Sequence, residues 1–200
     1  MDLLRLGLER GNTAEEALHV IIEMLERYGQ GGPAVRNGDR SYHNSFIIAD
    51  YREAWVLETS NRRWVFRRVE GVDSISNIYS TEYQWDEISC DAIDFAVSEG
   101  WAQKHHDFSF ARAYTDTTYH RLAGCQACYA RSQNLLNQEK NPIEAATFFG
   151  VLRDHYEDSL LAPRWSADEA LLQRGARYPK SSPLPERGTA ESRRGGGSKC

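Results

Sequence analysis

The stretch Ser45-Phe-Ile-Ile-Ala-Asp-Tyr-Arg-Glu-Ala-Trp-Val-Leu-Glu-Thr-Ser-Asn-Arg-Arg-Trp-Val-Phe-Arg-Arg-Val69 decides the fold of this chain. It contains three short runs of β-branched and aromatic residues, at positions 46–48, 55–57 and 64–66. Two polar, turn-forming segments separate these runs, Asp50-Tyr-Arg-Glu53 and Ser60-Asn-Arg62. Short β-rich runs joined by tight turns predict an antiparallel meander.

The chain then continues as Gly71-Val-Asp-Ser-Ile-Ser-Asn77, which we interpret as a fourth β-like run that ends at Asn77. A polar side chain at the end of a strand is held by rigid backbone, and functional residues often occupy such positions. Asn77 is therefore the first candidate for a site residue.

Helical patterns lie on both sides of the meander in sequence. Residues 2–10 form an amphipathic pattern before Gly11, and the capping-box spacing of Thr13-Ala-Glu-Glu16 begins a second helix that ends at Gly29. Further helices are predicted at 90–100, 108–114 and 118–137, and Asn141-Pro-Ile-Glu144 predicts the start of another, whose apolar residues should form a buried face. One block of strands flanked by helices predicts an α+β or layered α/β architecture.

The composition is that of a soluble globular protein. The chain has 200 residues, 40% hydrophobic and 26% charged, which is enough for one domain with a sizeable core. It has no apolar stretch long enough to span a membrane, and its first residues lack the basic start and apolar run of a secretory signal. Four cysteines without regular spacing do not suggest a disulfide framework. We therefore expect a cytoplasmic protein that binds no membrane.

The last 28 residues differ from the rest. Residues 1–172 hold 17 Lys and Arg against 27 Asp and Glu, whereas residues 173–200 hold 7 against 2. The tail is rich in Pro, Gly and Ser and almost lacks large apolar residues, so we expect it to be disordered. Its basic residues have a single aromatic residue among them, Tyr178, and we expect no nucleic-acid binding. The sudden change in composition also motivates the hypothesis that the tail is a frameshifted end.

Several short segments, taken in their order along the chain, resemble the secernin and cysteine-dipeptidase family of N-terminal-nucleophile hydrolases. They lie between residue 1 and about residue 170. The segments are Met1-Asp-Leu-Leu-Arg-Leu-Gly-Leu-Glu-Arg-Gly11, Thr13-Ala-Glu-Glu-Ala17, Tyr28-Gly-Gln-Gly-Gly32, Tyr42-His-Asn-Ser-Phe46, Glu53-Ala-Trp-Val-Leu-Glu-Thr59, Ile75-Ser-Asn77 and Leu152-Arg-Asp154.

The resemblance implies an αββα sandwich, of which residues 1–172 would form a part, and an enzyme that hydrolyses small peptides without a metal or organic cofactor. In this family the catalytic cysteine becomes the first residue of the mature chain and lies upstream of the helix that matches residues 1–10. The four cysteines here, Cys90, Cys125, Cys128 and Cys200, lie in or after regions that match later parts of the family. We therefore expect an internal fragment that is inactive without an N-terminal segment of the same fold.

The resemblance also assigns roles to residues. Asn77 corresponds to the asparagine whose side-chain amide stabilises the oxyanion, and Arg131 corresponds to a helical arginine that can hold a carboxylate. Arg121 lies in the same helical stretch and is an alternative, and a surface salt bridge is the other interpretation for either arginine. No cofactor-binding or metal-ligating residue is predicted. Cys125-Gln-Ala-Cys128 lacks a second Cys-x-x-Cys and is interpreted as incidental.

Other interpretations stay open. His43 beside Asn44 could serve acid–base chemistry, since histidine has an ordinary pKa near 6.5, but caps and turn hydrogen bonds are the favoured role for both. A secernin-like protein could act by binding, in regulated exocytosis, without catalysis. The aromatic segment Tyr79-Ser-Thr-Glu-Tyr-Gln-Trp85 could instead mark an unrelated binding module. A meander cut from its sheet should also expose edge backbone and an apolar face carrying Trp55, Leu57 or Phe66, so we expect self-association.

Overall fold

The computed structural model describes residues 2–31, 43–103, 107–115, 125–138 and 142–156. Within these ranges the protein has six helices and one open, four-stranded antiparallel sheet that does not close into a barrel. It is a mixed α+β protein, as the sequence predicts. The chain divides into two units, residues 1–151 and residues 152–200, and the predicted boundary between 172 and 173 lies outside the described residues.

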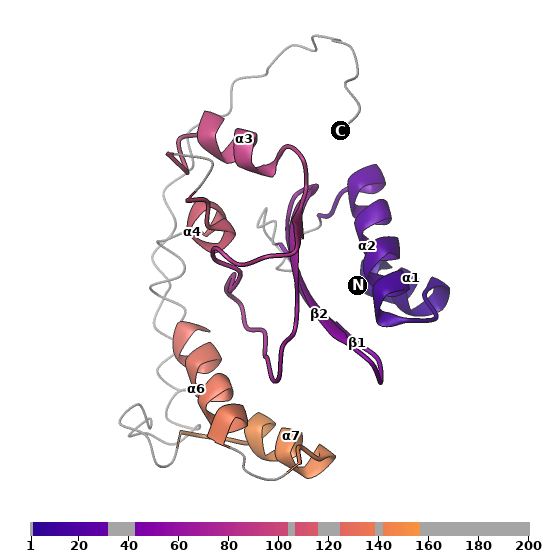
Figure 1. The fold of residues 1–200 in the computed structure, drawn as a ribbon, viewed down its shortest axis with the longest axis vertical. Helices are drawn as coiled ribbons and strands as arrows, with labels where there is room; N and C mark the ends of the chain where they lie inside the picture. Colours follow the sequence, from indigo (N-terminus) through magenta and orange to yellow (C-terminus); the bar gives the residue numbers. More distant parts are fainter. Residues whose placement is uncertain (1, 32–42, 104–106, 116–124, 139–141, 157–200) are drawn as a thin grey trace, which may run out of the picture. The chain divides into compact units, whose positions relative to one another are not determined.

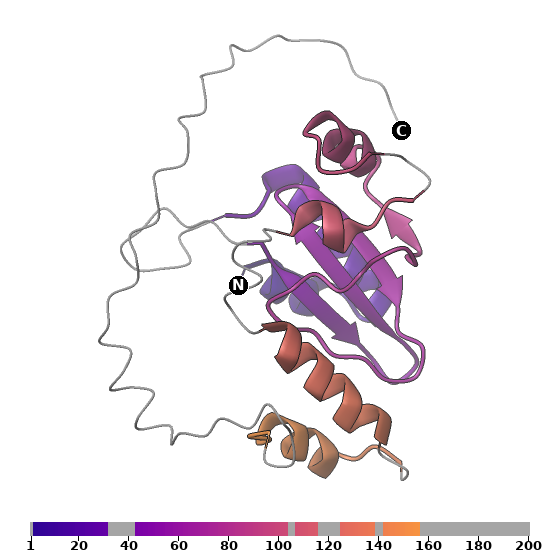
Figure 2. The same cartoon turned by 90° about the vertical axis from the view of Figure 1, so that its left-hand side faces the viewer.

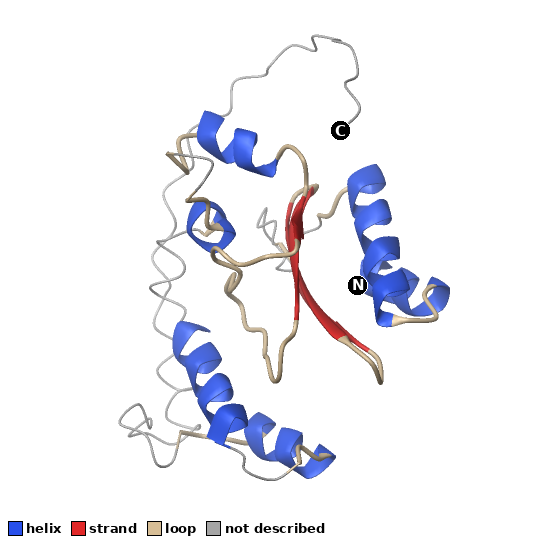
Figure 3. Cartoon of the chain, in the orientation of Figure 1, coloured by secondary structure: helices blue, strands red, loops and turns tan. Residues whose placement is uncertain are grey.

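The predicted meander is confirmed. Strands β1 (Ser45–Ala49), β2 (Ala54–Ser60) and β3 (Arg63–Arg68) pair antiparallel, with Phe46 opposite Leu57 and Leu57 opposite Phe66. Figure 2 shows these strands side by side, and Figure 3 shows the sheet edge-on between helices. The turn between β2 and β3 includes Asn61 at a φ of 56°, a left-handed conformation that asparagine tolerates.

The prediction that Asn77 ends a fourth strand is wrong. The fourth strand is β4 (Glu87–Ile88), in which Ile88 lies opposite Val65 of β3. Residues 70–79 form a loop with a single isolated bridge between Ser76 and Ile78. One physical reason is local hydrogen bonding. The side chain of Asp73 accepts from the backbone of Ser74, and such contacts compete with a strand ladder.

Two helices cover one face of the sheet (Figure 1), α1 (Asp2–Arg10) and α2 (Ala14–Tyr28). The predicted capping is confirmed, because the Thr13 hydroxyl accepts from the backbone N–H of Glu16 at 3.1 Å and Gly29, at a φ of 74°, follows the last residue of α2. The apolar stripe of α2 packs on the sheet. The cluster consists of Leu18, Ile21, Ile22, Leu25, Phe46, Leu57, Trp64 and Phe66. Leu57 and Phe66 are therefore buried, and the expectation of an exposed apolar face is wrong for them.

The opposite face packs against α3 (Ala92–Ser98) and α4 (Phe110–Tyr114), which lie within the predicted helical ranges 90–100 and 108–114. The second core cluster consists of Val65, Ala96, Phe108, Phe110, Ala113 and Tyr114. The Tyr114 hydroxyl donates to the carbonyl of Ala92 at 2.8 Å, and burial raises the pKa of Tyr114. The sheet thus lies between two helical layers.

Two more helices follow, α6 (Cys125–Gln138) and α7 (Ala145–Leu152). Residues 116–124 and Asn141 lie outside the described residues, and α7 begins at Ala145 rather than directly after Asn141. The prediction of a buried apolar face on α7 is wrong, since α7 has no buried residue and Phe149 is 56% exposed. Burial needs an apolar partner surface, and both core clusters are built from other elements. No helix in the described ranges is long and apolar enough to cross a membrane.

Asp50 joins the hairpin between β1 and β2 to the start of α2. Its carboxylate accepts from the backbone N–H groups of Ala14 at 2.9 Å, Arg52 at 2.7 Å and Glu53 at 3.1 Å. These hydrogen bonds lower the pKa of Asp50 below its ordinary value of 3.8, and the bond from Ala14 has the largest effect. The pKa is lower in the folded chain than in the unfolded one. The ionised carboxylate therefore stabilises the fold above about pH 4, and this contribution is lost as the pH falls through the folded pKa.

We expect Asp50→Asn to lower the urea midpoint of unfolding at neutral pH, because the amide cannot replace both carboxylate oxygens as acceptors. The difference from the wild type should shrink as the pH falls below about 4 and through the lowered pKa of Asp50, because the wild-type carboxyl then becomes protonated. Urea unfolding followed by circular dichroism over this pH range measures the difference. A constant difference across the range would contradict the assignment.

Candidate functional site

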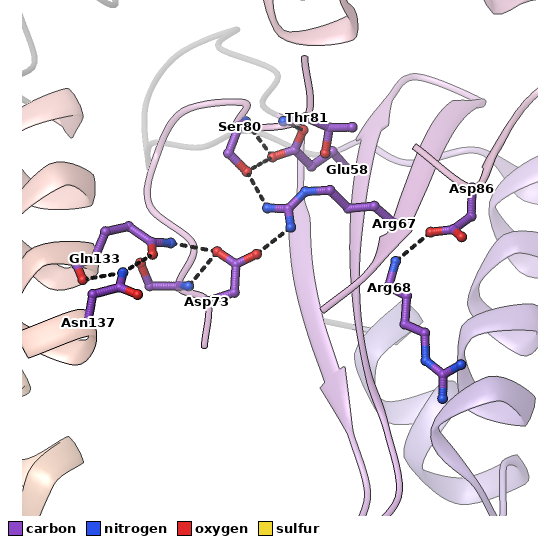
Figure 4. Close-up of polar contacts among 10 residues, drawn as sticks. Glu58, Arg67, Arg68, Asp73, Ser80, Thr81, Asp86, Gln133 and Asn137 are labelled. Atoms are coloured by element: carbon purple, nitrogen blue, oxygen red, sulfur yellow. Dashed lines mark hydrogen bonds and ion pairs between the residues drawn. The ribbon is translucent and has the colours of Figure 1, made fainter. Parts of the chain in front are cut away.

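A polar network connects the sheet, the loop between β3 and β4, and helix α6 (Figure 4). We define this network by six residues, Glu58, Arg67, Asp73, Ser80, Thr81 and Gln133. Among the described residues, Glu58 is the one charged residue that is fully buried, and the network places it close to the ion pair of Arg67 and Asp73. For this reason we treat the network as the framework of the candidate site.

Glu58 of β2 lies at the centre of the polar network and is fully buried. One of its carboxylate oxygens accepts from the backbone N–H of Ser80 at 2.6 Å and from the Ser80 hydroxyl at 2.8 Å. The other accepts from the backbone N–H of Thr81 at 3.0 Å. A buried carboxylate is costly unless it is hydrogen-bonded, and these three donors satisfy it.

Arg67 and Asp73 form the second charged pair of the network. The Asp73 side chain is 7% exposed and ion-paired with the Arg67 guanidinium, which also donates to the Ser80 hydroxyl at 3.3 Å. Asp73 further accepts from the side-chain amide of Gln133 on α6 at 2.6 Å. Burial raises the pKa of Tyr129, which also lies on α6, and the negative charge of Asp73 raises it further. The carboxylate of Asp73 thus bridges the sheet and α6.

The loop between β3 and β4 is anchored on both sides of Asn77. Before it, the Ser74 hydroxyl bonds to the Ser132 hydroxyl at 2.8 Å, and the Ser76 hydroxyl donates to the carbonyl of Cys125 at 3.2 Å. After it, the Tyr79 hydroxyl donates to the carbonyl of Thr59 at 2.7 Å, and burial raises the pKa of Tyr79. The residues before and after Asn77 are therefore held in place by hydrogen bonds.

Asn77 itself is exposed, between the bridged residues Ser76 and Ile78. Arg131 is half-buried on α6, the helix that Ser74 and Ser76 contact. The structure thus places the two predicted site residues on segments that touch each other. Arg121, the alternative arginine, lies outside the described residues.

The other predicted candidates occupy structural positions. The His43 ring accepts at Nδ1 from the backbone N–H of Asn61 at 3.2 Å, and desolvation lowers the pKa of His43. The Asn44 amide donates to the side chain of Gln30 at 2.6 Å, and its carbonyl accepts from the Thr59 hydroxyl at 2.7 Å. These contacts tie the beginning of β1 to β2 and to the residues that follow α2.

The remaining sequence motifs are dispersed. Cys125 is half-buried and Cys128 is exposed one helical turn further along α6. Within the described ranges, no three His, Cys, Asp or Glu side chains form a group that could hold a metal ion. In the aromatic segment, Tyr79 and Trp85 pack against the second core cluster, whereas Tyr83 is half exposed.

A shallow, open hollow lies over α1 and α2, away from the polar network. Its lining residues are Arg10, Glu15, Glu16, His19, Val20 and Glu23. The lining therefore includes neither Asn77 nor Arg131.

Sequence analysis did not single out Glu58, Arg67 or Asp73. A signal was present, because Glu58 alternates with Val56 along β2 and must share its inward face with that buried valine. A charged residue at an inward strand position needs partners, and its partners come from a loop more than twenty residues later.

Thr81 offers a test of hydrogen bonding in the polar network. Its side-chain hydroxyl is buried and has no hydrogen-bond partner among the described residues. We expect Thr81→Val, which keeps the shape and the backbone N–H, to raise the free energy of unfolding by about 1 kcal/mol. The same change at Thr59, whose buried hydroxyl bonds to Asn44, should lower it by about 1 to 2 kcal/mol. Urea unfolding of both variants measures the two changes in the free energy of unfolding. Changes of the same sign would contradict the prediction.

Comparison with known proteins adds no assignment. No family model matches the chain, and no solved structure matches it. The resemblance to secernins and cysteine dipeptidases therefore stays a prediction.

Proposed function

We propose that this chain supplies the oxyanion-stabilising part of a cysteine-type amidohydrolase that cleaves small peptides, of the secernin and cysteine-dipeptidase kind. One observation carries the proposal: the exposed residue Asn77 lies in a loop that is anchored on both sides, to α6 through Ser76 and to β2 through Tyr79. A neutral amide on fixed backbone suits an oxyanion donor, because it needs little reorganisation when negative charge develops.

In the proposed reaction, the thiolate of an N-terminal cysteine attacks the carbonyl carbon of the scissile peptide bond. The π electrons move to the carbonyl oxygen, where Asn77 donates a hydrogen bond to the resulting oxyanion. The α-amine takes the thiol proton and passes it to the leaving amine as the tetrahedral intermediate collapses and the C–N bond breaks. Water then attacks the thioester, which releases the carboxylic acid and restores the thiol. Arg131 would bind the substrate carboxylate. The cysteine comes from polypeptide other than these 200 residues, and the chain alone is inactive.

For the architecture, we propose that the meander belongs to one layer of an αββα sandwich. The antiparallel pairing and the two helices on one face support this proposal. The second core cluster covers the other face near β3 and β4, while Ile47 of β1 is 43% exposed. A further sheet would therefore have to pack on the face of β1 that carries the Ile47 side chain. We place the assembled enzyme in the cytoplasm, where a reducing environment keeps a catalytic thiol active.

The test is to sequence the gene upstream of Met1, express the joined reading frame, and assay the product against a panel of dipeptides. We expect a frame that encodes a strand beginning with cysteine, and hydrolysis that is lost when this cysteine is changed to alanine. A frame without such a cysteine, or a folded joined product that cleaves no dipeptide, would overturn the proposal. The second outcome would favour the alternative of a binding protein in regulated exocytosis.

A further inference from the structure

Strand β1 is the outermost strand of the sheet at its N-terminal end. The strand order is β1-β2-β3-β4, so β1 pairs with β2 alone among the described strands. One row of its backbone N–H and C=O groups therefore faces away from the sheet.

The hydrogen bonds at the ends of β1 show which residues form this row. The N–H of Thr59 donates to the carbonyl of Asn44 at 3.0 Å, and the N–H of Asp50 donates to the carbonyl of Glu53 at 2.9 Å. Bonded and non-bonded pairs alternate along an antiparallel ladder. Phe46 and Ile48 consequently bond to β2, whereas the backbone groups of Ser45, Ile47 and Ala49 point outward.

The sequence of β1 itself lacks the usual protection against pairing. Natural edge strands carry charged side chains, proline or a bulge that discourages a second strand. The sequence of β1 is Ser-Phe-Ile-Ile-Ala, with no charge and no proline, and it pairs residue by residue with β2 without a bulge. Its central residue, Ile47, is 43% exposed.

We propose that a second copy of this chain pairs antiparallel with β1, around a twofold axis at Ile47. In this register Ile47 lies opposite Ile47 of the second copy, and Ser45 lies opposite Ala49. Each of the three outward-facing residues then lies opposite an outward-facing residue of the second copy. Each of these opposed pairs can exchange two backbone hydrogen bonds.

The side chains suit this register as well. On one face of the combined sheet the two Ile47 side chains form a cross-strand pair, and on the other face Phe46 lies opposite Ile48 of the second copy. At the ends, the neutral Asn44 lies opposite Asp50, so no like charges meet. The chain itself thus supplies a strand complementary to the edge in backbone groups, side-chain size and charge.

The experiment is sedimentation velocity on the full chain over a range of concentrations. We expect a reversible monomer–dimer equilibrium. Ile47→Lys should weaken dimerisation by about tenfold or more, because it sets two like charges directly opposite and removes an apolar pair. Leu8→Lys is the matched control, since Leu8 is 75% exposed on α1 and its change should leave the equilibrium unaltered.

Amide hydrogen exchange, measured by NMR, provides a second readout. It distinguishes pairing along β1 from nonspecific association of the chain. The N–H groups of Ser45, Ile47 and Ala49 should gain protection as the chain concentration rises, whereas those of Phe46 and Ile48 should be protected throughout. A monomer at every concentration, or equal effects of both lysine variants, would overturn the proposal. So would protection of the three outward groups at all concentrations, because a segment of the same chain would then cover the edge.

Discussion

Replacing Glu58 by alanine is expected to lower the free energy of unfolding by about 3 kcal/mol. The change removes a buried acceptor and leaves three donors without a partner, namely the N–H and hydroxyl of Ser80 and the N–H of Thr81. Buried donors without partners cost more than the net value of the hydrogen bonds they once made. Urea unfolding, monitored by tryptophan fluorescence and circular dichroism, measures the loss.

Two further variants separate this explanation from a general effect of losing a charge. Glu58→Gln keeps one acceptor oxygen but turns an NH₂ group toward an N–H donor, so its loss should be intermediate, about 1 to 2 kcal/mol. Glu70→Ala removes an exposed glutamate near the end of β3 and should change stability by less than about 0.5 kcal/mol. A Glu58→Ala protein as stable as the Glu70→Ala protein would rule out the proposed role of the buried carboxylate.

Asn77→Ala has the largest expected effect on activity. In the proposed enzyme, which joins this chain to a segment with the nucleophilic cysteine, kcat for dipeptide hydrolysis should fall about 100- to 1,000-fold, with little change in KM. An oxyanion donor acts on charge that develops in the transition state, so its removal slows the reaction without weakening substrate binding. Steady-state kinetics with a dipeptide substrate measures both parameters.

The matched control for Asn77 is Asn134→Ala, because Asn134 is also an exposed asparagine, on α6. Its removal should leave kcat unchanged, and both variants should unfold at the same urea concentration as the wild type. If Asn77→Ala instead raised KM while kcat stayed constant, Asn77 would be a substrate-binding residue, and the oxyanion assignment would be wrong.

The meander and the first two helices could be predicted because their signals are local. Turn residues at 50–53 and 60–62 delimit strands β1 to β3, and the capping contact between Thr13 and Glu16 marks the start of α2. Each feature depends on residues a few positions apart. A single sequence displays such relations directly.

The loop around Asn77 could not be predicted in the same way. Residues 71–77 contain Val72 and Ile75 at positions that suggest a strand, but their neighbours bond to residues far along the chain. Asp73 pairs with Arg67 and Gln133, and Ser74 pairs with Ser132. Contacts separated by about sixty positions leave no periodic pattern in one sequence, so tertiary hydrogen bonding overrides the β propensity. The apolar run in α7 failed as a predictor of burial for a related reason, because hydrophobicity does not specify a partner.

The carboxylate of Asp73 contacts both Arg67 on the sheet and Gln133 on α6, so the loop between β3 and β4 is joined to both elements. A force that draws α6 away from the sheet would strip one partner from Asp73 and pull on Ser76 through the Cys125 carbonyl. The position of the backbone that carries Asn77 therefore depends on the position of helix α6, through the hydrogen bonds of Asp73, Ser74 and Ser76.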